Sequence, residues 1–341
     1  GNRPAAELAE RISSLAPMPG GSVFFTSGGS DAVDTASKLA RRYWSLRGRR
    51  SKTVVISRDR SYHGMHGFGT SLAGIAANRD GYGIIVGDVA TVGWADSAEL
   101  AAAIDRLDAD RVAAFICEPV IGAGGVLFPP EGYLKEAQEL CRDSDVLFIA
   151  DEVVTGFGRA GDWFACNRLG LQPDLVVFAK GVTSGYLPLG GVIAAPNVVD
   201  PFRAPGVMWR HGYTYSGHAT VCALALANIG ILEVERLAAR AVHLEELFAQ
   251  TLGSLAGHDA VSEVRTGLGA LAAVQFRDDL SADPRLAAVA TAASREVGLL
   301  TRMLSGGALQ VSPPLVISDA EVDEMVGRFS AALDLTLARM S

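Results

Sequence analysis

Short apolar runs alternate with helical patterns over much of the chain. The runs rich in β-branched or aromatic residues, which predict strands, cover residues 23–26, 53–57, 112–119, 145–153 and 174–180. Helical periods lie between them, at residues 30–44 and 131–143. The strands are apolar on both faces, as is typical of a parallel sheet that helices cover on either side. The pattern predicts an α/β fold over about residues 20–205, with a mostly parallel central sheet.

The pattern changes after about residue 235. The elements predicted there are an Ala/Leu/Glu-rich helix, a glycine turn at 267–269, a strand-like LAAVQF run, a helix at 284–297 and a last helix after Pro313 and Pro314. They indicate a smaller C-terminal α+β domain. For a chain of this length we expect one large and one small domain. We place an N-terminal helix in residues 1–20, the large domain in 21–235 and the small domain in 236–341.

Composition narrows the class of protein. The 341 residues are 49% hydrophobic and 20% charged, with a formal net charge of −8 and no basic cluster, which argues against nucleic acid as a partner. The longest apolar stretch, residues 219–232, contains Asn228 and is shorter than the roughly 20 residues that span a bilayer. It predicts a buried helix, and no membrane partner. Four cysteines without a CxxC pair predict buried free thiols and a cytoplasmic location.

Polar residues stand at the carboxyl ends of the predicted strands. Glu118 ends one strand, Asp151 and Glu152 end the next, and Lys180 ends the third. Open α/β sheets bind ligands beyond these ends, so we expect the side chains to converge. A lysine that leaves an apolar strand is partly desolvated, which lowers its pKa and frees its lone pair to attack a carbonyl carbon. Taken alone, Lys180 fits better as the start of a loop.

Neighbouring residues each have a functional and a structural interpretation. A buried Asp151 needs a partner, and both a protonated pyridine nitrogen and an arginine such as Arg159 are suitable. The glycine turn at 27–33 offers backbone N–H groups to an anion, or is a plain turn before a helix. Tyr62 suits either stacking on a cofactor ring or packing in a loop. The HxxH spacing at residues 63–66 has no further ligand cluster, so we expect no metal.

Six motifs occur in a fixed order along the chain. They are FFTSGGSDAVDTASKLARRYW, SYHG, CEPVIGAGGV, FIADEVVTGFGRAG, PDLVVFAKG and HGYTYSGH. In order and spacing they resemble those of the class III, fold-type I aminotransferases that depend on pyridoxal 5′-phosphate (PLP). The likeness runs from about residue 5 to the end. It implies that the protein moves an amino group from an amine or amino acid to a keto acid or aldehyde in two successive half-reactions.

The resemblance assigns roles around the cofactor ring. Lys180 would form the Schiff base and move the proton between substrate and cofactor. Asp151 would hold the pyridine N–H. Val153 would press on one face of the ring, Tyr62 would stack on the other, and His63 would lie beside Tyr62 among the cofactor-binding residues.

The resemblance also assigns roles at the edge of the site. Gly29 and Ser30 would bind the phosphate. Glu118 would lie near the phenolic oxygen. Thr214 would reach the phosphate of the neighbouring subunit, which implies a homodimer with active sites at its interface. Arg302, in the small domain, would bind a substrate carboxylate, because guanidinium and carboxylate pair through two parallel hydrogen bonds.

Two departures from the family pattern bear on the site. Gly28 stands where the family's phosphate turn usually has a hydroxyl residue, so we expect somewhat weaker phosphate binding through the remaining backbone donors. Family members also carry a further N-terminal portion, several tens of residues long, that supplies part of the substrate pocket and some dimer contacts. Either the sequence is a trimmed form that lacks this portion, or the protein has an incomplete pocket.

Rival functions remain at this stage. Residues 267–272 fit a GxGxxA dinucleotide pattern, but the turn leads into a strand-like run instead of a helix, and we reject it. GxSxG and HExxH motifs are absent, so a hydrolase lacks support. An aminomutase, decarboxylase or racemase would share every cofactor residue. A non-catalytic PLP-binding homologue is the remaining alternative.

Overall fold

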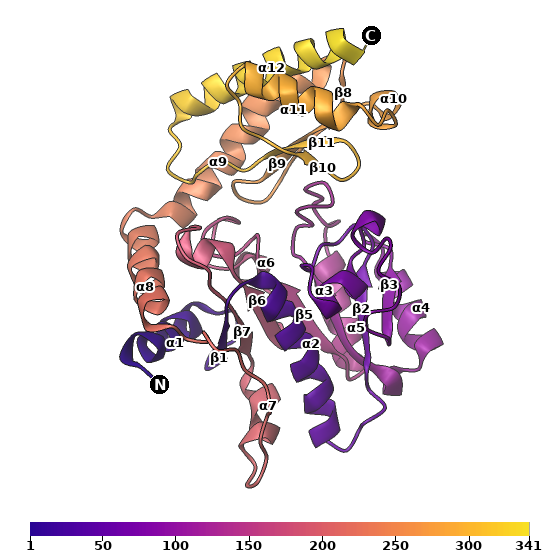
Figure 1. Cartoon of the computed structure of the whole chain (residues 1–341), viewed down its shortest axis with the longest axis vertical. Coiled ribbons are helices and arrows are strands. Elements are labelled where there is room, and N and C mark those ends of the chain that lie inside the picture. Colours follow the sequence, from indigo (N-terminus) through magenta and orange to yellow (C-terminus); the bar gives the residue numbers. More distant parts are fainter. Residues whose placement is uncertain (341) are drawn as a thin grey trace.

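The molecule consists of two regions, each built around one β-sheet (Figure 1). The computed structural model describes residues 1–340. The larger region holds a seven-stranded sheet in the order β1-β7-β6-β5-β4-β2-β3. Its strands are β1 (Ser22–Thr26), β2 (Val54–Arg58), β3 (Val89–Val92), β4 (Val112–Cys117), β5 (Leu147–Asp151), β6 (Leu175–Phe178) and β7 (Gly190–Ala194).

Most neighbouring strands of this sheet are parallel. The pairs β2–β3, β2–β4, β4–β5 and β5–β6 are parallel, whereas β7 runs antiparallel to both β6 and β1. Every residue of β4, β5 and β6 is buried, because other elements cover both faces of the sheet. The predicted α/β fold with a mostly parallel sheet is therefore confirmed.

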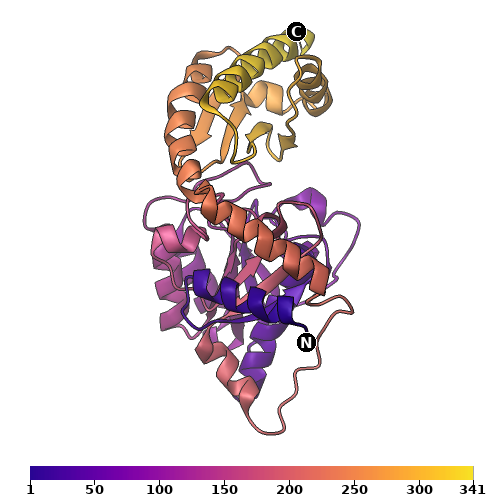
Figure 2. The ribbon, with the colours of Figure 1, turned by 90° about the vertical axis from the view of Figure 1, so that its left-hand side faces the viewer.

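Eight helices accompany the large sheet within the described residues. They are α1 (Arg3–Leu15), α2 (Gly29–Leu46), α3 (Gly67–Leu72), α4 (Ser97–Leu107), α5 (Tyr133–Asp143), α6 (Ala165–Leu169), α7 (Pro196–Val199) and α8 (Ala219–Val234). Helix α2 lies across one face and contacts β1 and β4 to β7. Helix α1 lies against α8 (Figure 2), where Arg11 Nη2 is 2.6 Å from a Glu233 carboxylate oxygen.

The smaller region folds around an antiparallel sheet in the order β10-β11-β9-β8. Its elements are α9 (Leu237–Thr251), β8 (Val261–Thr266), β9 (Ala272–Phe276), α10 (Asp278–Ser281), α11 (Leu286–Glu296), β10 (Met303–Leu304), β11 (Ala308–Val311) and α12 (Asp319–Met340). Helices α11 and α12 pack against each other. The region has its own apolar core, and a further apolar cluster joins it to the larger region.

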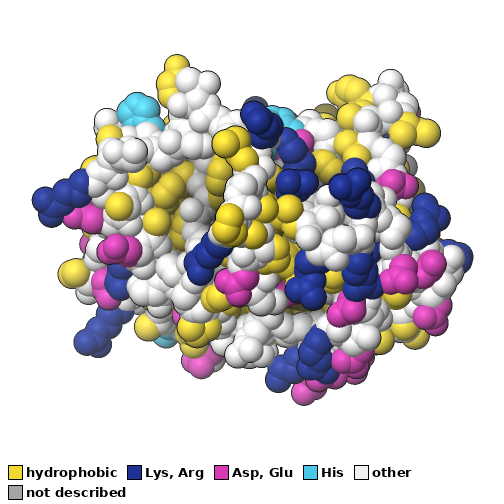
Figure 3. All heavy atoms as spheres, turned by 90° about the horizontal axis from the view of Figure 1, so that it is seen from below, with side chains coloured by type: hydrophobic (Ala, Val, Ile, Leu, Met, Phe, Trp, Pro, Cys, Tyr) yellow, Lys and Arg dark blue, Asp and Glu magenta, His cyan; other side chains and the backbone are white. Residues whose placement is uncertain are grey.

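One expectation about burial is only partly right. Helix α8 was expected to be buried, yet its side chains are apolar around most of its circumference and one face is open: Ile231 and Val234 are 53% and 82% exposed. Hydrophobic side chains also gather across the end of the molecule opposite the smaller region (Figure 3). Within residues 1–340, none of the helices is long and apolar enough to cross a membrane.

Candidate active site

Three strands of the large sheet deliver the candidate residues to one edge. Strands β4, β5 and β6 are parallel neighbours, so their carboxyl ends lie together. Glu118 follows β4 and Asp151 ends β5, as predicted. Lys180 was expected at the end of a strand, but β6 stops at Phe178 and Lys180 is the first residue of the 3₁₀ turn η3 (Lys180–Thr183). Ala179 is therefore the one residue between the end of β6 and the start of this turn.

Asp151 and His63 form a buried pair. His63 Nδ1 lies 2.7 Å from Asp151 Oδ2, and the two residues are 1% and 4% exposed. The other carboxylate oxygen, Oδ1, accepts a hydrogen bond of 3.1 Å from the backbone N–H of Val153. The alternative ion pair between Asp151 and Arg159 is wrong. Arg159 instead donates to the carbonyls of Ala270 and Pro313 in the smaller region, and burial lowers its pKa to about 10.

Lys180 has a perturbed amine and a constrained backbone. Its φ angle is 42°, in the left-handed region that non-glycine residues adopt at a cost. The residue is exposed, yet desolvation by the surrounding protein lowers the pKa of its amine below the ordinary value. Asp151 and Glu118 oppose this fall, and Arg302 adds to it. Asp151 ends β5, the parallel neighbour of β6, so the strand order brings Asp151 close to the turn that carries Lys180.

Glu118 is a buried carboxylate held by the backbone. Its Oε1 accepts from Tyr62 N at 3.0 Å and its Oε2 accepts from Gly122 N at 2.9 Å. Burial raises the pKa of Glu118, and nearby Asp151 raises it further, whereas His63 and the two N–H groups lower it. Glu118 thereby fixes the loop that carries the half-buried Tyr62.

The glycine turn before α2 presents an open helix start. Gly28 is the N-cap and provides no side-chain cap. A Cβ added to Gly29 would lie 3.1 Å from both methyl groups of Val153, so the turn and Val153 are in close contact. Ser30 Oγ accepts a hydrogen bond of 3.2 Å from Met65 N. The first N–H groups of an 18-residue helix thus face the same edge as Val153 and are suited to an anion.

Two predicted residues lie farther along the chain. Thr214 is exposed, in the segment between η4 (Asp200–Arg203) and α8. The adjacent Tyr213 hydroxyl donates to the Asp31 carbonyl at 3.1 Å, which ties this segment to the start of α2. Arg302, just before β10, donates from Nε to Gln310 Oε1 at 2.7 Å. Arg302 also lines a cavity of about 470 Å³ in the smaller region.

Sequence reasoning grouped Glu152 with the converging residues, but its side chain has another role. It is fully buried and accepts hydrogen bonds from the Thr155 hydroxyl, from Ala165 N at 3.0 Å and from Cys166 N at 2.7 Å. The backbone N–H of Glu152 donates to Val177 in β6. Glu152 therefore anchors the loop 153–164 to the sheet. Strand alternation was the signal that could have separated it from Asp151.

The residues present fit PLP. His63 Nε2 is buried without a hydrogen-bond partner in the described structure, whereas His63 Nδ1 pairs with the buried carboxylate of Asp151. An amine, a half-buried aromatic ring and an uncapped helix start lie around this pair.

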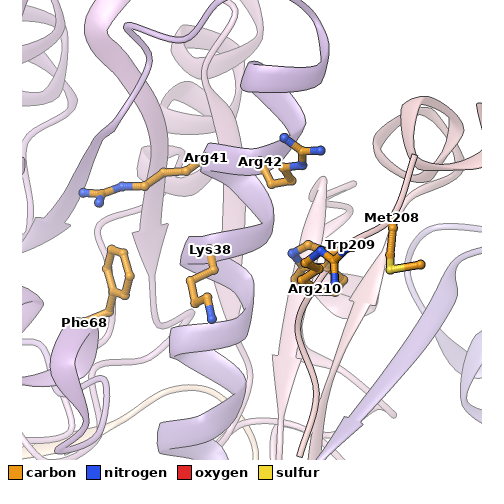
Figure 4. A pocket seen from close by; sticks show the side chains of 7 residues that line it. All are labelled: Lys38, Arg41, Arg42, Phe68, Met208, Trp209 and Arg210. Carbon is orange, nitrogen blue, oxygen red and sulfur yellow. The ribbon is translucent and has the colours of Figure 1, made fainter. Parts of the chain in front are cut away.

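Two cavities lie elsewhere. The larger, about 590 Å³, is lined by cationic side chains of α2, by Phe68 of α3 and by the 208–210 segment (Figure 4). Neither cavity is lined by Lys180 or Asp151.

Comparison with known proteins is consistent across sequence and structure. The family description "Aminotransferase class-III" matches residues 1–333. The putrescine–pyruvate aminotransferase of Pseudomonas aeruginosa is 36% identical, over 98% of this chain and 78% of that protein. The omega-aminotransferase of Caulobacter vibrioides is 37% identical, over 94% and 78%. The omega-transaminase of Pseudomonas jessenii, solved in complex with PMP, has a TM-score of 0.93 at 34% identity, over 99% and 80%.

Proposed function

Because this chain belongs to the class III aminotransferases and catalyses PLP-dependent transamination, we propose that Lys180 is the residue that binds PLP covalently. The observation that carries this proposal is the position of Lys180: it follows β6, the parallel neighbour of β5, which ends at the buried Asp151. Burial also lowers the pKa of the Lys180 amine. A lower pKa leaves more of the amine neutral, and only a neutral amine attacks an aldehyde. Lys180 would then move the proton at the substrate carbon that carries the amino group.

Each neighbouring residue would hold one part of the cofactor. When bound, PLP supplies an aldehyde for amines and a ring that accepts electrons from the substrate carbon. Asp151 would pair with the ring nitrogen, and His63 would keep that carboxylate oriented. Val153 and Tyr62 would lie against the two ring faces. The proximity of Gly29 to Val153 supports this arrangement.

The remaining roles lie at the ends of the cofactor. Gly29 and Ser30 would bind the phosphate through backbone N–H groups at the start of α2, where the helix dipole favours an anion. Glu118 would lie near the phenolic oxygen. Its two backbone hydrogen bonds hold it in a fixed position, which suits an orienting role.

We propose a primary amine with its amino group at a chain terminus as the donor, and a 2-keto acid such as pyruvate as the acceptor. Two relatives support this class, because one is named for putrescine and pyruvate and the other for omega-amino groups. Arg302 would bind the acceptor carboxylate, and its electrostatic effect on Lys180 supports a location within reach of the substrate. A panel of terminal amines and 2-keto acids would test this specificity.

We propose that the protein forms a homodimer in which Thr214 reaches the partner's phosphate. Exposed apolar residues support a surface that a partner subunit covers. Ile84 is 90% exposed, Tyr215 70% and Met208 64%. Residues 21–235 and 236–341 would act as the two domains, with Arg236 between α8 and α9 as their junction. Light scattering would give the mass in solution. A monomer with full activity would contradict the shared site.

The decisive experiment uses borohydride and a lysine variant. The chain has only four lysines, at 38, 52, 135 and 180, so peptide mapping can assign a label unambiguously. Borohydride treatment with PLP should fix a pyridoxyl label on Lys180. Lys180→Ala should abolish turnover while noncovalent PLP binding remains. A label on another lysine, or unchanged turnover, would refute the assignment.

A further inference from the structure

The turn that carries Lys180 holds two residues in an unfavourable backbone conformation. Lys180, the first residue of η3, and Ser184, which caps its end, have φ angles of 42° and 48°. Neither is glycine, and each such residue is retained only where the surroundings impose it. Some contact outside the turn must therefore supply the restraint.

One side of the turn is pressed by the loop after β5. A Cβ on Gly181 would lie 3.0 Å from Phe157 Cβ and 3.1 Å from the Gly156 carbonyl oxygen. Phe157 is itself packed edge-on against Phe178, the last residue of β6. This contact blocks the turn in one direction but supplies no hydrogen bond that would select its conformation.

The other side of the turn is bound by a single side chain, Asn228 of α8. Its Nδ2 donates to the Gly181 carbonyl at 2.9 Å and to the Val182 carbonyl at 3.1 Å. Its Oδ1 accepts from the Ser184 hydroxyl at 2.7 Å. Asn228 is buried in a helix that is otherwise strongly apolar. An amide is costly there unless its donors and acceptor are satisfied, and all of them are used on this turn.

We propose that Asn228 is a positioning residue for Lys180, which fixes the left-handed turn so that the amine projects from the end of β6. The inference rests on the proposed role of Lys180 and names a residue that acts through it. Without Asn228, the turn would relax away from positive φ, and the fraction of molecules that present the amine would fall. Relief of the strain at one residue corresponds to a loss of about ten-fold in that fraction.

The test measures covalent attachment instead of turnover. In that attachment the neutral Lys180 amine forms a C=N bond with the PLP aldehyde carbon, and the aldehyde oxygen leaves as water with both amine protons. Apoprotein is mixed with PLP and quenched with borohydride at set times, and the label on Lys180 is counted by peptide mapping. Asn228→Leu, which keeps the volume but removes the polar groups, should slow labelling about ten-fold.

A second substitution separates positioning from general stability. Glycine adopts positive φ without cost. Adding Ser184→Gly to Asn228→Leu should therefore recover much of the lost rate. Leu232→Ala, one helical turn along α8, is the matched control: it should lower the melting temperature and leave the labelling rate unchanged. Should Asn228→Leu not fold, Asn228→Asp keeps the side-chain size, and its carboxylate cannot donate to the two carbonyls, so the same slowing is expected.

The outcomes separate the inference from the function on which it rests. A wild-type protein that gains no label at Lys180 overturns the proposed function. A wild type labelled at Lys180, with Asn228→Leu within about two-fold of its rate, overturns only the role of Asn228. A slowing that Leu232→Ala matches, or that Ser184→Gly leaves unchanged, would show loss of stability instead of loss of positioning.

Discussion

Lys52 is a fully buried lysine at the end of the sheet opposite the candidate active site. Its Nζ donates to the carbonyls of Ala109 at 2.6 Å, Val112 at 2.9 Å and Asp145 at 2.7 Å. It also lies 4.5 Å from the centre of the Trp44 ring. These contacts join the amino ends of β2, β4 and β5. Lys52→Met removes the charge and keeps much of the side-chain volume.

The pH dependence of this substitution follows from the pKa of Lys52. Burial lowers that pKa from 10.5 to about 8, and nearby Arg49 adds to the fall. Below pH 8 the amine is charged in both folded and unfolded chains, so the cost of burying the charge is fully present. Between about pH 8 and 10.5 the folded chain loses the proton first and the unfolded chain holds more protons. Wild-type stability relative to Lys52→Met should therefore rise by about 3 kcal/mol across this interval.

Urea unfolding of the apoprotein at pH 7 and pH 10, followed by tryptophan fluorescence, measures this change. The comparison is the difference in unfolding free energy between wild type and variant, which cancels groups that both proteins share. Lys135→Met, at an exposed lysine, is the control and should follow wild type at both pH values. A difference between wild type and Lys52→Met that is the same at both pH values would refute the reasoning.

Three further predictions concern the site and its support. Asp151→Asn should reduce turnover by orders of magnitude in a coupled transaminase assay, because it removes the buried negative charge, and a rate within a few-fold of wild type would make Asp151 structural. Arg302→Ala should raise KM for keto-acid acceptors more than for aldehydes, and equal losses would count against carboxylate binding. Glu152→Gln should lower unfolding stability by about 1–3 kcal/mol in urea, because an amide N–H would face the N–H donors of Ala165 and Cys166; an unchanged midpoint would contradict this.

The sequence predicts the fold where apolar patterning is strong. Strands β2, β4, β5 and β6 are predictable because a strand that is buried on both faces is a nearly continuous run of apolar residues. The sequence pattern does not predict strand β7, because Gly190 and Gly191 at its start are more typical of a loop. The glycines are required by packing: a Cβ on Gly191 would lie 2.4 Å from the Phe178 ring. The need for glycine comes from a neighbour distant in the sequence, so no local pattern could reveal it.

The candidate site was predictable as a set of residues but not as a set of contacts. The order of the motifs points to Lys180, Asp151 and Glu118 from the sequence alone. The three residues stand at or just after the ends of parallel neighbouring strands, so they lie at one edge of the sheet. The hydrogen-bond partner of Asp151, in contrast, could not be predicted from the sequence. His63 comes from a loop 88 residues earlier, and Arg159, which is chemically as suitable, binds the smaller region. Only tertiary packing decides between two partners that are both chemically suitable.

The two adjacent acids at the end of β5 have different roles: one lies in the candidate site and the other anchors a loop. Side chains alternate across a strand, so Asp151 and Glu152 point to opposite sides. Asp151 meets His63 at the sheet edge, whereas Glu152 binds N–H groups at the start of α6. The loop that Glu152 anchors contains Val153, against Gly29, and Phe157, against Gly181 of the lysine turn. The buried carboxylate of Glu152 thus helps to hold in place the loop residues that contact Gly29 and the turn of Lys180.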